Sequence, residues 1–490
     1  MNNESLDLSL EEFQQLLAQS SELVINQYQE LNEKKAYHDF TQPEVESWFD
    51  EPLPEEGKSN TELLNEVRKK VLATATNNLG PHMYGYVMSG GNQVATVAEL
   101  LATTINQNAT KWHLAPAMSE IEKRVIRWTT EMIGYAPNAG GVLVSGGSAA
   151  NLTGLTVARN IFFENKNIKQ EGLFGQKPFV VYTSDQVHSC VDKSVQILGI
   201  GLKHLRKIPT DDQFKIDTQA LEEQINQDIK DDLTPFCLIG TAGTVNTGAI
   251  DDLAELARLA KQYKMWYHID GAYGALASVL DSTKEAYQGM AEADSIALDF
   301  HKWLYQPFEA GCTLVRDWSM LKKTYFNQAE YLDTVLETDQ NRLEFNEHYF
   351  QLSRNAKAFK VWMSLKAYGF KKIKAMIQKD IDLTNYLIEQ IEKSSDFEIK
   401  AYGLAVACFR YIGDCQSEDE IVAINQRLIP ALEKDGRVFI TSTKLKGELV
   451  IRACFINHRK TIETTDYLLS VIREVAEELT LVKIESQAAE

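Results

Sequence analysis

The chain has 490 residues, of which 44% are hydrophobic and 24% charged, so it is long enough for about two or three domains with a substantial core, and disorder is excluded. Its 50 basic and 69 acidic residues give a net charge of −19 without a basic cluster, which makes nucleic acid and membrane surfaces poor partners. No apolar run reaches the roughly 18 residues needed to cross a bilayer, and no secretory signal opens the chain, so we expect a cytoplasmic protein.

Residues 1–84 are predicted to form an N-terminal helical arm. Leu10, Phe13 and Leu17 recur at helical spacing, and a polar, proline-bearing stretch follows over residues 42–58. Because the apolar pattern stops there, we expect an arm that is hardly a domain of its own. The first domain boundary is placed after residue 84.

Residues 85–368 are predicted to form a large α/β domain, because short apolar runs alternate with longer helical patterns. The predicted strands are 141–144, 179–182, 236–239, 265–269, 295–298 and 312–315. Since these runs are apolar on both faces, we expect a mostly parallel sheet with helices on both faces. Ligands of such sheets bind beyond the carboxyl ends of the strands, so the residues that follow each run are the candidates for chemistry.

Residues 369–490 are predicted to form a small C-terminal α+β domain. A long helical pattern over residues 356–368 precedes it. Strand candidates follow at 406–411, 437–441 and 448–455. Together with the helical patterns of this region, they indicate a small antiparallel sheet packed with helices.

The residues that follow each of the first two predicted strands have both a functional and a purely structural interpretation. The first strand ends in Ser145-Gly146-Gly147-Ser148, which opens a helical pattern. Free N–H groups at a helix N-terminus suit a phosphate, but a plain turn capped by Ser148 accounts for the same residues. His188 follows the second strand, where a histidine is either a catalytic residue or a surface residue at a helix start.

The next three strands end in residues with more telling chemistry. Small and hydroxyl residues follow over 240–248, where either a flat ligand or a simple loop fits them. Asp270 ends the fourth strand, and a buried carboxylate needs an arginine, a metal ion or a protonated ring nitrogen. No second acid or histidine with metal spacing accompanies it, so no metal site is predicted. Lys302 follows the fifth strand among aromatic residues, where a desolvated amine serves as a nucleophile toward a carbonyl.

In combination, these four features match the needs of pyridoxal phosphate. Lys302 would hold the aldehyde as a Schiff base, Asp270 would pair with the protonated ring nitrogen, and Gly147 and Ser148 would take the phosphate. The protonated ring would then accept the electrons of a bond broken at a substrate Cα. A doubly wound nucleotide-binding protein without covalent chemistry is the alternative from a different class.

The motifs that carry this combination resemble the group II pyridoxal-phosphate decarboxylases, which include the aromatic-amino-acid, histidine and glutamate decarboxylases. They lie at residues 145–151, 185–189, 268–273 and 301–303. The likeness runs from about residue 81 to residue 459. It implies a fold-type-I homodimer whose N-terminal arm wraps the partner, with active sites at the subunit interface.

The resemblance also implies individual roles. Lys302 is the Schiff-base lysine, Asp270 the partner of the ring nitrogen, and His188 stacks on the ring opposite Ala272. The implied cofactor-binding set is Gly147, Ser148, His188, Thr244, Asp270, Ala272, His301 and Lys302. The implied substrate neighbours, some contributed across the dimer, are Tyr84, Tyr86, Asn108 and Trp112.

Two departures from the family pattern concern the cofactor. Relatives often read Asn-Pro-His-Lys or Asp-Pro-His-Lys where this chain has Asp299 and Phe300 before the final pair. An anion at position 299 is unsuited to a phosphate contact. Val245 stands where aromatic decarboxylases often have a second threonine, which leaves Thr244 as the hydroxyl near the cofactor.

A third departure concerns the proton that replaces CO₂. In animal and plant aromatic decarboxylases a mobile-loop tyrosine donates it, and an ungapped match places Phe345 at that position. A phenylalanine cannot donate a proton, and a positioned acid contributes roughly 10²–10⁴-fold. The candidate donors are therefore Tyr349, His348 and His188.

We predict that the protein removes the α-carboxylate of an L-amino acid as CO₂ and releases the amine. Aromatic residues such as Tyr86, Trp112 and Phe308 favour an aromatic side chain. The runner-up is oxidative conversion of the amino acid to an aldehyde, because a phenylalanine at this loop position accompanies that reaction in plant relatives. Many bacterial relatives also lack the loop tyrosine, so we favour decarboxylation over aldehyde formation.

Overall fold

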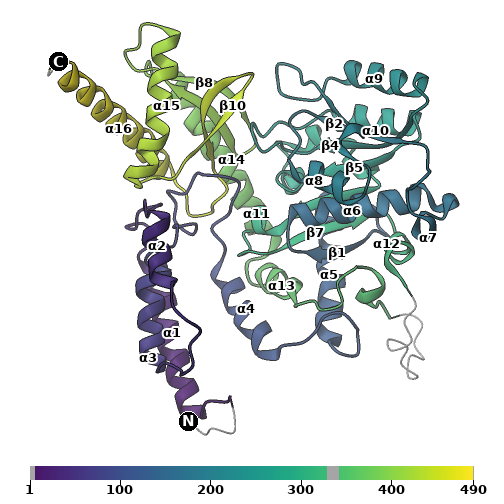
Figure 1. Ribbon diagram of the computed structural model, residues 1–490, viewed down its shortest axis with the longest axis horizontal. Coiled ribbons are helices and arrows are strands. Elements are labelled where there is room, and N and C mark those ends of the chain that lie inside the picture. The colour runs from purple at the N-terminus through teal and green to yellow at the C-terminus, as the bar shows by residue number, and fades with distance from the viewer. Residues whose placement is uncertain (1–5, 328–341, 489–490) are drawn as a thin grey trace.

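The computed structural model describes residues 6–327 and 342–488. A large domain, a small domain and an N-terminal arm are visible in it, and the arm and the small domain lie on the same side of the large domain (Figure 1). No helix within the described residues is long and apolar enough to cross a membrane.

The large domain is built on a seven-stranded sheet in the order β1-β7-β6-β5-β4-β2-β3. Its strands are β1 Gly140–Val144, β2 Phe179–Ser184, β3 Leu205–Ile208, β4 Thr234–Thr241, β5 Trp266–Asp270, β6 Ser295–Asp299 and β7 Gly311–Val315. Strands β3, β2, β4, β5 and β6 pair in parallel, whereas β7 is antiparallel to both β1 and β6. The prediction of a mostly parallel sheet is therefore confirmed.

Helices cover both faces of this sheet because its strands are apolar on both sides. The side chains of β2 alternate, so that Val180 and Tyr182 join one hydrophobic cluster while Phe179 and Val181 join another. Residues of α6, α8 and α12 belong to the second cluster, and residues of α5, α9 and α10 to the first. Their bounds are α5 Pro116–Ile133, α6 Gly147–Phe162, α8 Cys190–Ile197, α9 Thr218–Lys230, α10 Leu253–Gln262 and α12 Trp318–Tyr325.

The small domain holds a four-stranded antiparallel sheet in the order β10-β11-β9-β8. The strands are β8 Phe397–Gly403, β9 Val406–Tyr411, β10 Thr441–Leu445 and β11 Glu448–Cys454. The helices are α14 Phe370–Glu392, α15 Glu418–Asp435 and α16 Ile462–Ala488, and α13 Lys357–Tyr368 precedes them. The predicted antiparallel sheet with helices is confirmed.

The strand predicted at 437–441 is wrong in position. Residues Val438 and Phe439 are buried, as their apolar character requires, but Phe439 forms an isolated bridge with Met83 near the arm. The strand β10 begins only at Thr441. Strands β3 and β8 were not predicted, because each lies at an edge of its sheet and carries partly exposed polar residues.

The arm consists of α1 Leu10–Gln29, α2 Gln42–Phe49 and α3 Asn60–Glu66, followed by a π-helical turn over Val67–Leu72. Ser9 caps α1 with a capping box to Glu12. None of these helices has a buried residue. Helix α4, Gln93–Ile105, leads from the arm region into the large domain.

A buried ion pair ties helix α5 to the start of the sheet and to the segment before α13. Arg354 Nη2 lies 2.5 Å from Glu122 Oε1, and both side chains are almost fully buried. Glu122 Oε1 also accepts the N–H of Leu143 in β1 at 2.9 Å, and Arg354 donates to the carbonyl of Ala109 at 3.0 Å.

Replacing Glu122 by alanine is expected to lower the free energy of unfolding by about 3–5 kcal/mol, because it leaves the Arg354 guanidinium buried without its counter-ion. Denaturant unfolding followed by circular dichroism measures this loss. Asp281→Ala is the control, since the Asp281–Lys374 pair is exposed and such pairs contribute about 1 kcal/mol or less. Equal losses in the two variants would contradict the prediction.

Candidate active site

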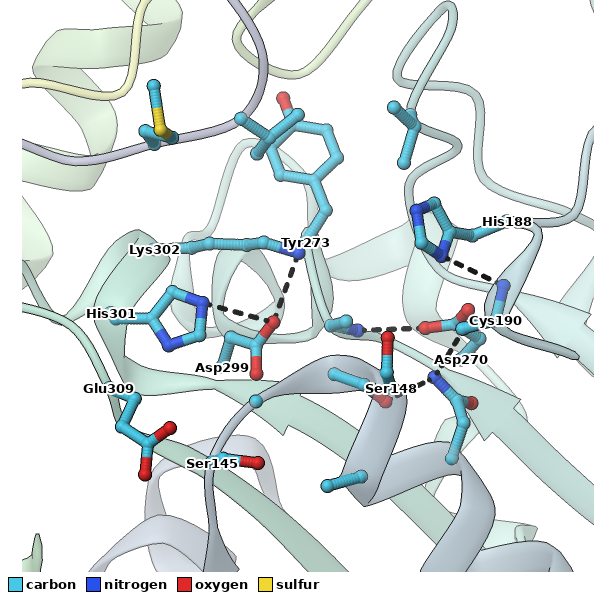
Figure 2. A pocket seen from close by; sticks show the side chains of 18 of the residues that line it. Ser145, Ser148, His188, Cys190, Asp270, Tyr273, Asp299, His301, Lys302 and Glu309 are labelled. Carbon is cyan, nitrogen blue, oxygen red and sulfur yellow. Dashed lines mark hydrogen bonds and ion pairs between the residues drawn. The ribbon is translucent and has the colours of Figure 1, made fainter. Parts of the chain in front are cut away.

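A cavity of ≈ 580 Å³ opens at the carboxyl edge of the large sheet. Its wall is made by residues that follow β1, β2, β4, β5 and β6, as is expected of a doubly wound sheet. The sequence-predicted residues that line it are Gly147, Ser148, His188, Asp270, Ala272, His301 and Lys302. Residues that are distant in the chain are thus brought together at one site (Figure 2).

The turn between β1 and α6 forms one end of the cavity. Ser145 and Ser148 are exposed there, and α6 begins at Gly147. A Cβ atom on Gly147 would lie 2.9 Å from both Ala272 Cβ and Asp299 Oδ2, so this position requires glycine. The turn therefore presents the free N–H groups of a helix N-terminus to the cavity, which suits an anion.

Asp270 lies at the end of β5 and is only 5% exposed. Its Oδ1 accepts the N–H of Ala272 at 3.2 Å. Across residues 6–327 and 342–488, no arginine, lysine or histidine forms an ion pair with it, and no group of three or more potential metal ligands is found. Asp270 therefore presents a buried carboxylate to the cavity, where a cationic group of a ligand, such as a protonated ring nitrogen, could pair with it.

A buried network stands behind Asp270. His268, on the same strand, is fully buried, and its Nδ1 and Nε2 lie 2.7 Å from Ser295 Oγ and 2.8 Å from Asn151 Oδ1. Burial lowers the pKa of His268 to about 4, so the ring is neutral at neutral pH. Asn151 in turn donates to the carbonyl of Gly147 at 2.9 Å. Sequence reasoning assigned no role to this network, although His268 and Asn151 fall inside the quoted motifs.

Lys302 belongs to the short helix α11, Phe300–Trp303, that follows β6. Its Nζ lies 3.1 Å from Asp299 Oδ2. The flanking residues are held by a buried acid of the small domain, because Asp380 Oδ2 accepts Trp303 Nε1 at 3.0 Å and the Tyr305 hydroxyl at 2.7 Å. Burial raises the pKa of Asp380 to about 7.

The two histidines at the cavity differ in their surroundings. His188 is exposed toward the cavity, and its Nδ1 accepts the N–H of Cys190 at 3.2 Å. In the neutral ring the hydrogen is therefore on Nε2, which is left to act as a donor. His301 is 7% exposed, its Nδ1 accepts the N–H of Ala310 at 3.2 Å, and burial lowers its pKa.

The structure does not place Thr244 in the cavity wall. Thr244 is fully buried, and its hydroxyl is 2.9 Å from Thr247 Oγ1 within its own loop. Thr241 lines the cavity instead, and its Oγ1 is buried without a hydrogen-bond partner among the described residues. The sequence reading ended the third strand at residue 239, whereas β4 continues to Thr241 and so brings that residue to the sheet edge.

None of the four predicted substrate neighbours lines the cavity of this chain. Tyr84 is fully buried and donates to the carbonyl of Thr464 at 2.8 Å, so packing against the small domain fixes it. Tyr86 is 59% exposed, at a backbone φ of 56°. Asn108 accepts the N–H of Arg354, and Trp112 donates to Glu120, both away from the cavity.

Phe345, which aligns with the loop tyrosine of animal and plant relatives, lies in the hydrophobic core. Phe345 is fully buried, and the Arg354 guanidinium carbon lies 4.7 Å from its ring centroid. Tyr349 and His348 are 2% and 4% exposed and do not line the cavity. Among the three candidate donors, His188 alone lines it. The segment 328–341, just before Phe345, is outside the described residues.

Comparison with known proteins identifies the family. The model of the pyridoxal-dependent decarboxylase conserved domain matches residues 43–412. The chain is 35% identical over 481 residues to an aromatic-L-amino-acid decarboxylase of Bacillus atrophaeus, covering 98% of each chain. It is 27% identical over 408 residues to a phenylacetaldehyde synthase of Arabidopsis thaliana, covering 81% of this chain and 82% of that one. The crystal structure of Oryza sativa TDC with PLP and tryptamine matches it with a TM-score of 0.91 at 22% identity, covering 97% of this chain and 99% of that chain.

The chain belongs to the pyridoxal-dependent decarboxylase family, and the resemblance read from its motifs is confirmed. It is a fold-type-I enzyme whose cofactor is pyridoxal 5′-phosphate. The site fits this cofactor, because the glycine turn leaves space for an anion, Asp270 presents a carboxylate without an ion-pair partner among the described residues, and Lys302 presents an amine. The alternative of a nucleotide-binding protein without covalent chemistry is therefore wrong.

Proposed function

We propose that the protein decarboxylates an aromatic L-amino acid to the corresponding amine. The observation that carries this proposal is the placement of Asp270 and Lys302 on one cavity wall, with Asp270 buried and lacking a cationic partner in the described part of the chain. Pyridoxal phosphate supplies an aldehyde that bonds amines and a ring that, when protonated, accepts an electron pair. Family membership and the 35% identity to an aromatic-L-amino-acid decarboxylase support the same reaction.

Each residue of the cavity has a separate role in this proposal. Lys302 supplies the amine that bonds the cofactor, and Asp270 holds the proton on the ring nitrogen, since a buried carboxylate stabilises a neighbouring cation. The N–H groups at the start of α6, with Ser148 and His301, hold the phosphate. His188 and Ala272 both line the cavity and would hold the ring between them. The Nε2 hydrogen of His188 would be available in the cavity, where a proton must replace CO₂ at the substrate Cα.

The proposal favours an aromatic substrate. Val87, Met88 and Phe308 supply apolar surface to the cavity wall, and none of the described residues that line it is arginine. An acidic side chain would therefore meet no guanidinium clamp in this chain. The relative of 35% identity is described as acting on aromatic amino acids, which agrees with this wall.

We further propose that the enzyme works as a homodimer in the cytoplasm. Large apolar side chains of the arm and of α4 are exposed in the single chain, among them Leu10, Phe13, Ile25 and Leu100. Burying them against a second copy would remove their apolar surface from water. Tyr86, Asn108 and Trp112 would serve a substrate only as contributions across that interface. Analytical ultracentrifugation measures the mass of the assembly, which should be twice that of the 55.3 kDa chain.

His188→Ala is expected to weaken cofactor binding by about two- to tenfold, because aromatic stacking contributes about 0.5–1.5 kcal/mol. Titration of visible absorbance with added pyridoxal phosphate measures the affinity. His188→Phe is the matched variant, since it keeps a stacking ring and lacks Nε2–H. We expect it to retain the affinity and to lose turnover, and a fully active His188→Phe variant would exclude His188 as the proton donor.

A screen of the common amino acids tests the proposed function. Release of CO₂ with one equivalent of amine, greatest for an aromatic amino acid, is the expected result. The aldehyde-forming alternative predicts ammonia and hydrogen peroxide beside CO₂, and these products would overturn the proposal. The phenylalanine that favoured this alternative, Phe345, is fully buried and does not line the cavity.

A further inference from the structure

Asp299 has an unusual position for an acid in a phosphate-binding site. It ends β6, is 2% exposed, and its Oδ2 lies 3.1 Å from Lys302 Nζ and 3.6 Å from His301 Nε2. Its Oδ1 is buried and has no hydrogen-bond partner within the described residues. Figure 2 shows the carboxylate directed at the lysine and the histidine together.

The surroundings of Asp299 argue against a role as a phosphate ligand. The carboxylate lies directly beside the turn that would hold the phosphate, since a Cβ atom on Gly147 would be 2.9 Å from Oδ2. A Cβ atom on Gly311 of β7 would be 2.8 Å from Oδ1, so two glycines leave room for this side chain. A carboxylate has no hydrogen to donate to a phosphate and repels it.

The same geometry gives Asp299 another partner. A buried carboxylate is stable only with a counter-charge or hydrogen-bond donors. The Lys302 ammonium supplies that charge at 3.1 Å as long as its nitrogen is not bonded elsewhere. When the nitrogen is bonded to the cofactor, it keeps at most one hydrogen and its charge is shared with the conjugated ring, so its contact with Asp299 is weaker than that of a free ammonium. His301 Nε2, at 3.6 Å, is the other neighbour of the carboxylate.

We propose that Asp299 is the counter-ion of the free Lys302 ammonium and that it thereby weakens the attachment of the cofactor to this lysine. This inference rests on the proposed function, because it assumes that Lys302 is the residue to which the cofactor is bonded. Asp299 is a positioning residue in this scheme. It stabilises the lysine in its released form, so an incoming amine displaces Lys302 more readily than it would from a site with a neutral residue at 299.

Asp299→Asn tests the proposal in the holoenzyme, because asparagine has nearly the same size and no charge. Hydroxylamine is added, and the loss of the visible absorbance of the bound cofactor is followed. We expect release to be slower by about tenfold, since the departing lysine loses its counter-ion. Asp380→Asn is the matched control, because Asp380 is also a buried acid and it contacts Trp303 and Tyr305 but forms no ion pair with Lys302. Its release rate should change much less. An unchanged release rate in Asp299→Asn would overturn the proposal.

A second measurement uses the full chain after removal of the cofactor. Acylation by an amine-specific reagent at neutral pH is mapped by peptide mass spectrometry, and Lys302 should react faster in Asp299→Asn than in the original chain. Lys360, which is buried and paired with Glu99, is the internal reference for folding. Equal labelling of Lys302 in the two proteins would refute the ion pair. If Asp299→Asn does not fold, Asp299→Ser removes the same charge with less volume.

The two proposals fail in different ways. If the original holoenzyme shows no visible absorbance that borohydride reduction abolishes, the assignment of Lys302 to the cofactor is wrong. The labelling experiment still decides whether Asp299 pairs with Lys302. If the absorbance is present and neither release nor labelling changes in the variant, the proposed function stands and the role of Asp299 is wrong.

Discussion

Replacing Lys302 by alanine is expected to lower turnover by at least about 10⁴-fold, the scale of loss seen when a covalent catalytic group is removed. The reason is geometric, because α11 presents the Lys302 amine to the same cavity as the Asp270 carboxylate. The variant should also lack the visible absorbance that borohydride reduction removes from the original enzyme. Release of CO₂ from the best substrate, measured beside the absorption spectrum, checks both expectations.

Two further variants distinguish the covalent role of Lys302 from the effect of its positive charge. Lys302→Arg keeps a cation near Asp299 but cannot bond an aldehyde at neutral pH, because guanidinium does not lose its proton, and it should be as inactive as Lys302→Ala. Lys357→Ala removes an equally shielded lysine, whose amine pairs with Glu309, and should retain turnover. Activity in Lys302→Arg would show that charge rather than covalent bonding is needed.

Much of this site was predictable because strand ends are readable from sequence. The runs before Asp270 and Lys302 are apolar on both faces, and a buried parallel strand is the structure that such a run adopts. A titratable residue directly after it must then lie at the ligand-binding edge of the sheet. The same reasoning placed His188 and the glycine turn at this edge, and the cavity brings all four together.

The predicted site residues that do not line the cavity of this chain are those for which tertiary packing decides which way the side chain faces. Thr241 is the last residue of β4 and Thr244 lies in the loop after it, and the length of β4 determines which of the two hydroxyl residues reaches the cavity. Tyr84 and Phe345 are aromatic residues that the hydrophobic core takes up, with no local pattern to distinguish them from substrate contacts.

The contacts of Asp299 could not be predicted from the sequence either, because they too depend on tertiary packing. The motif showed that an acid precedes His301 and Lys302, and this made a phosphate contact doubtful. It did not show that Oδ2 faces Lys302 Nζ, because that depends on the course of β7 and of the α6 turn around the carboxylate. Glycines at positions 147 and 311 are the feature that creates this space.

Replacing Asp270 by asparagine is expected to reduce turnover by about 10³-fold, at the upper end of the loss caused by removing one electrostatic partner from an active site. Asparagine keeps the size of the side chain and its acceptor for the Ala272 N–H, but it cannot stabilise a proton on the ring nitrogen. The bound ring would then be a poorer acceptor for the electron pair left behind as CO₂ departs. Single-turnover measurements of CO₂ release give the rate of this step.

The matched control is Asp251→Asn, because Asp251 is equally buried and caps the backbone N–H groups of Ile216 and Thr241 without lining the cavity. If Asp270 acts through the ring nitrogen, Asp270→Asn should bind the cofactor and fold normally while CO₂ release slows. Asp251→Asn should instead lose stability and keep a much larger part of its turnover per folded molecule. The opposite pattern would mean that Asp270 is a structural acid, and the electron acceptor would have to be held by another residue.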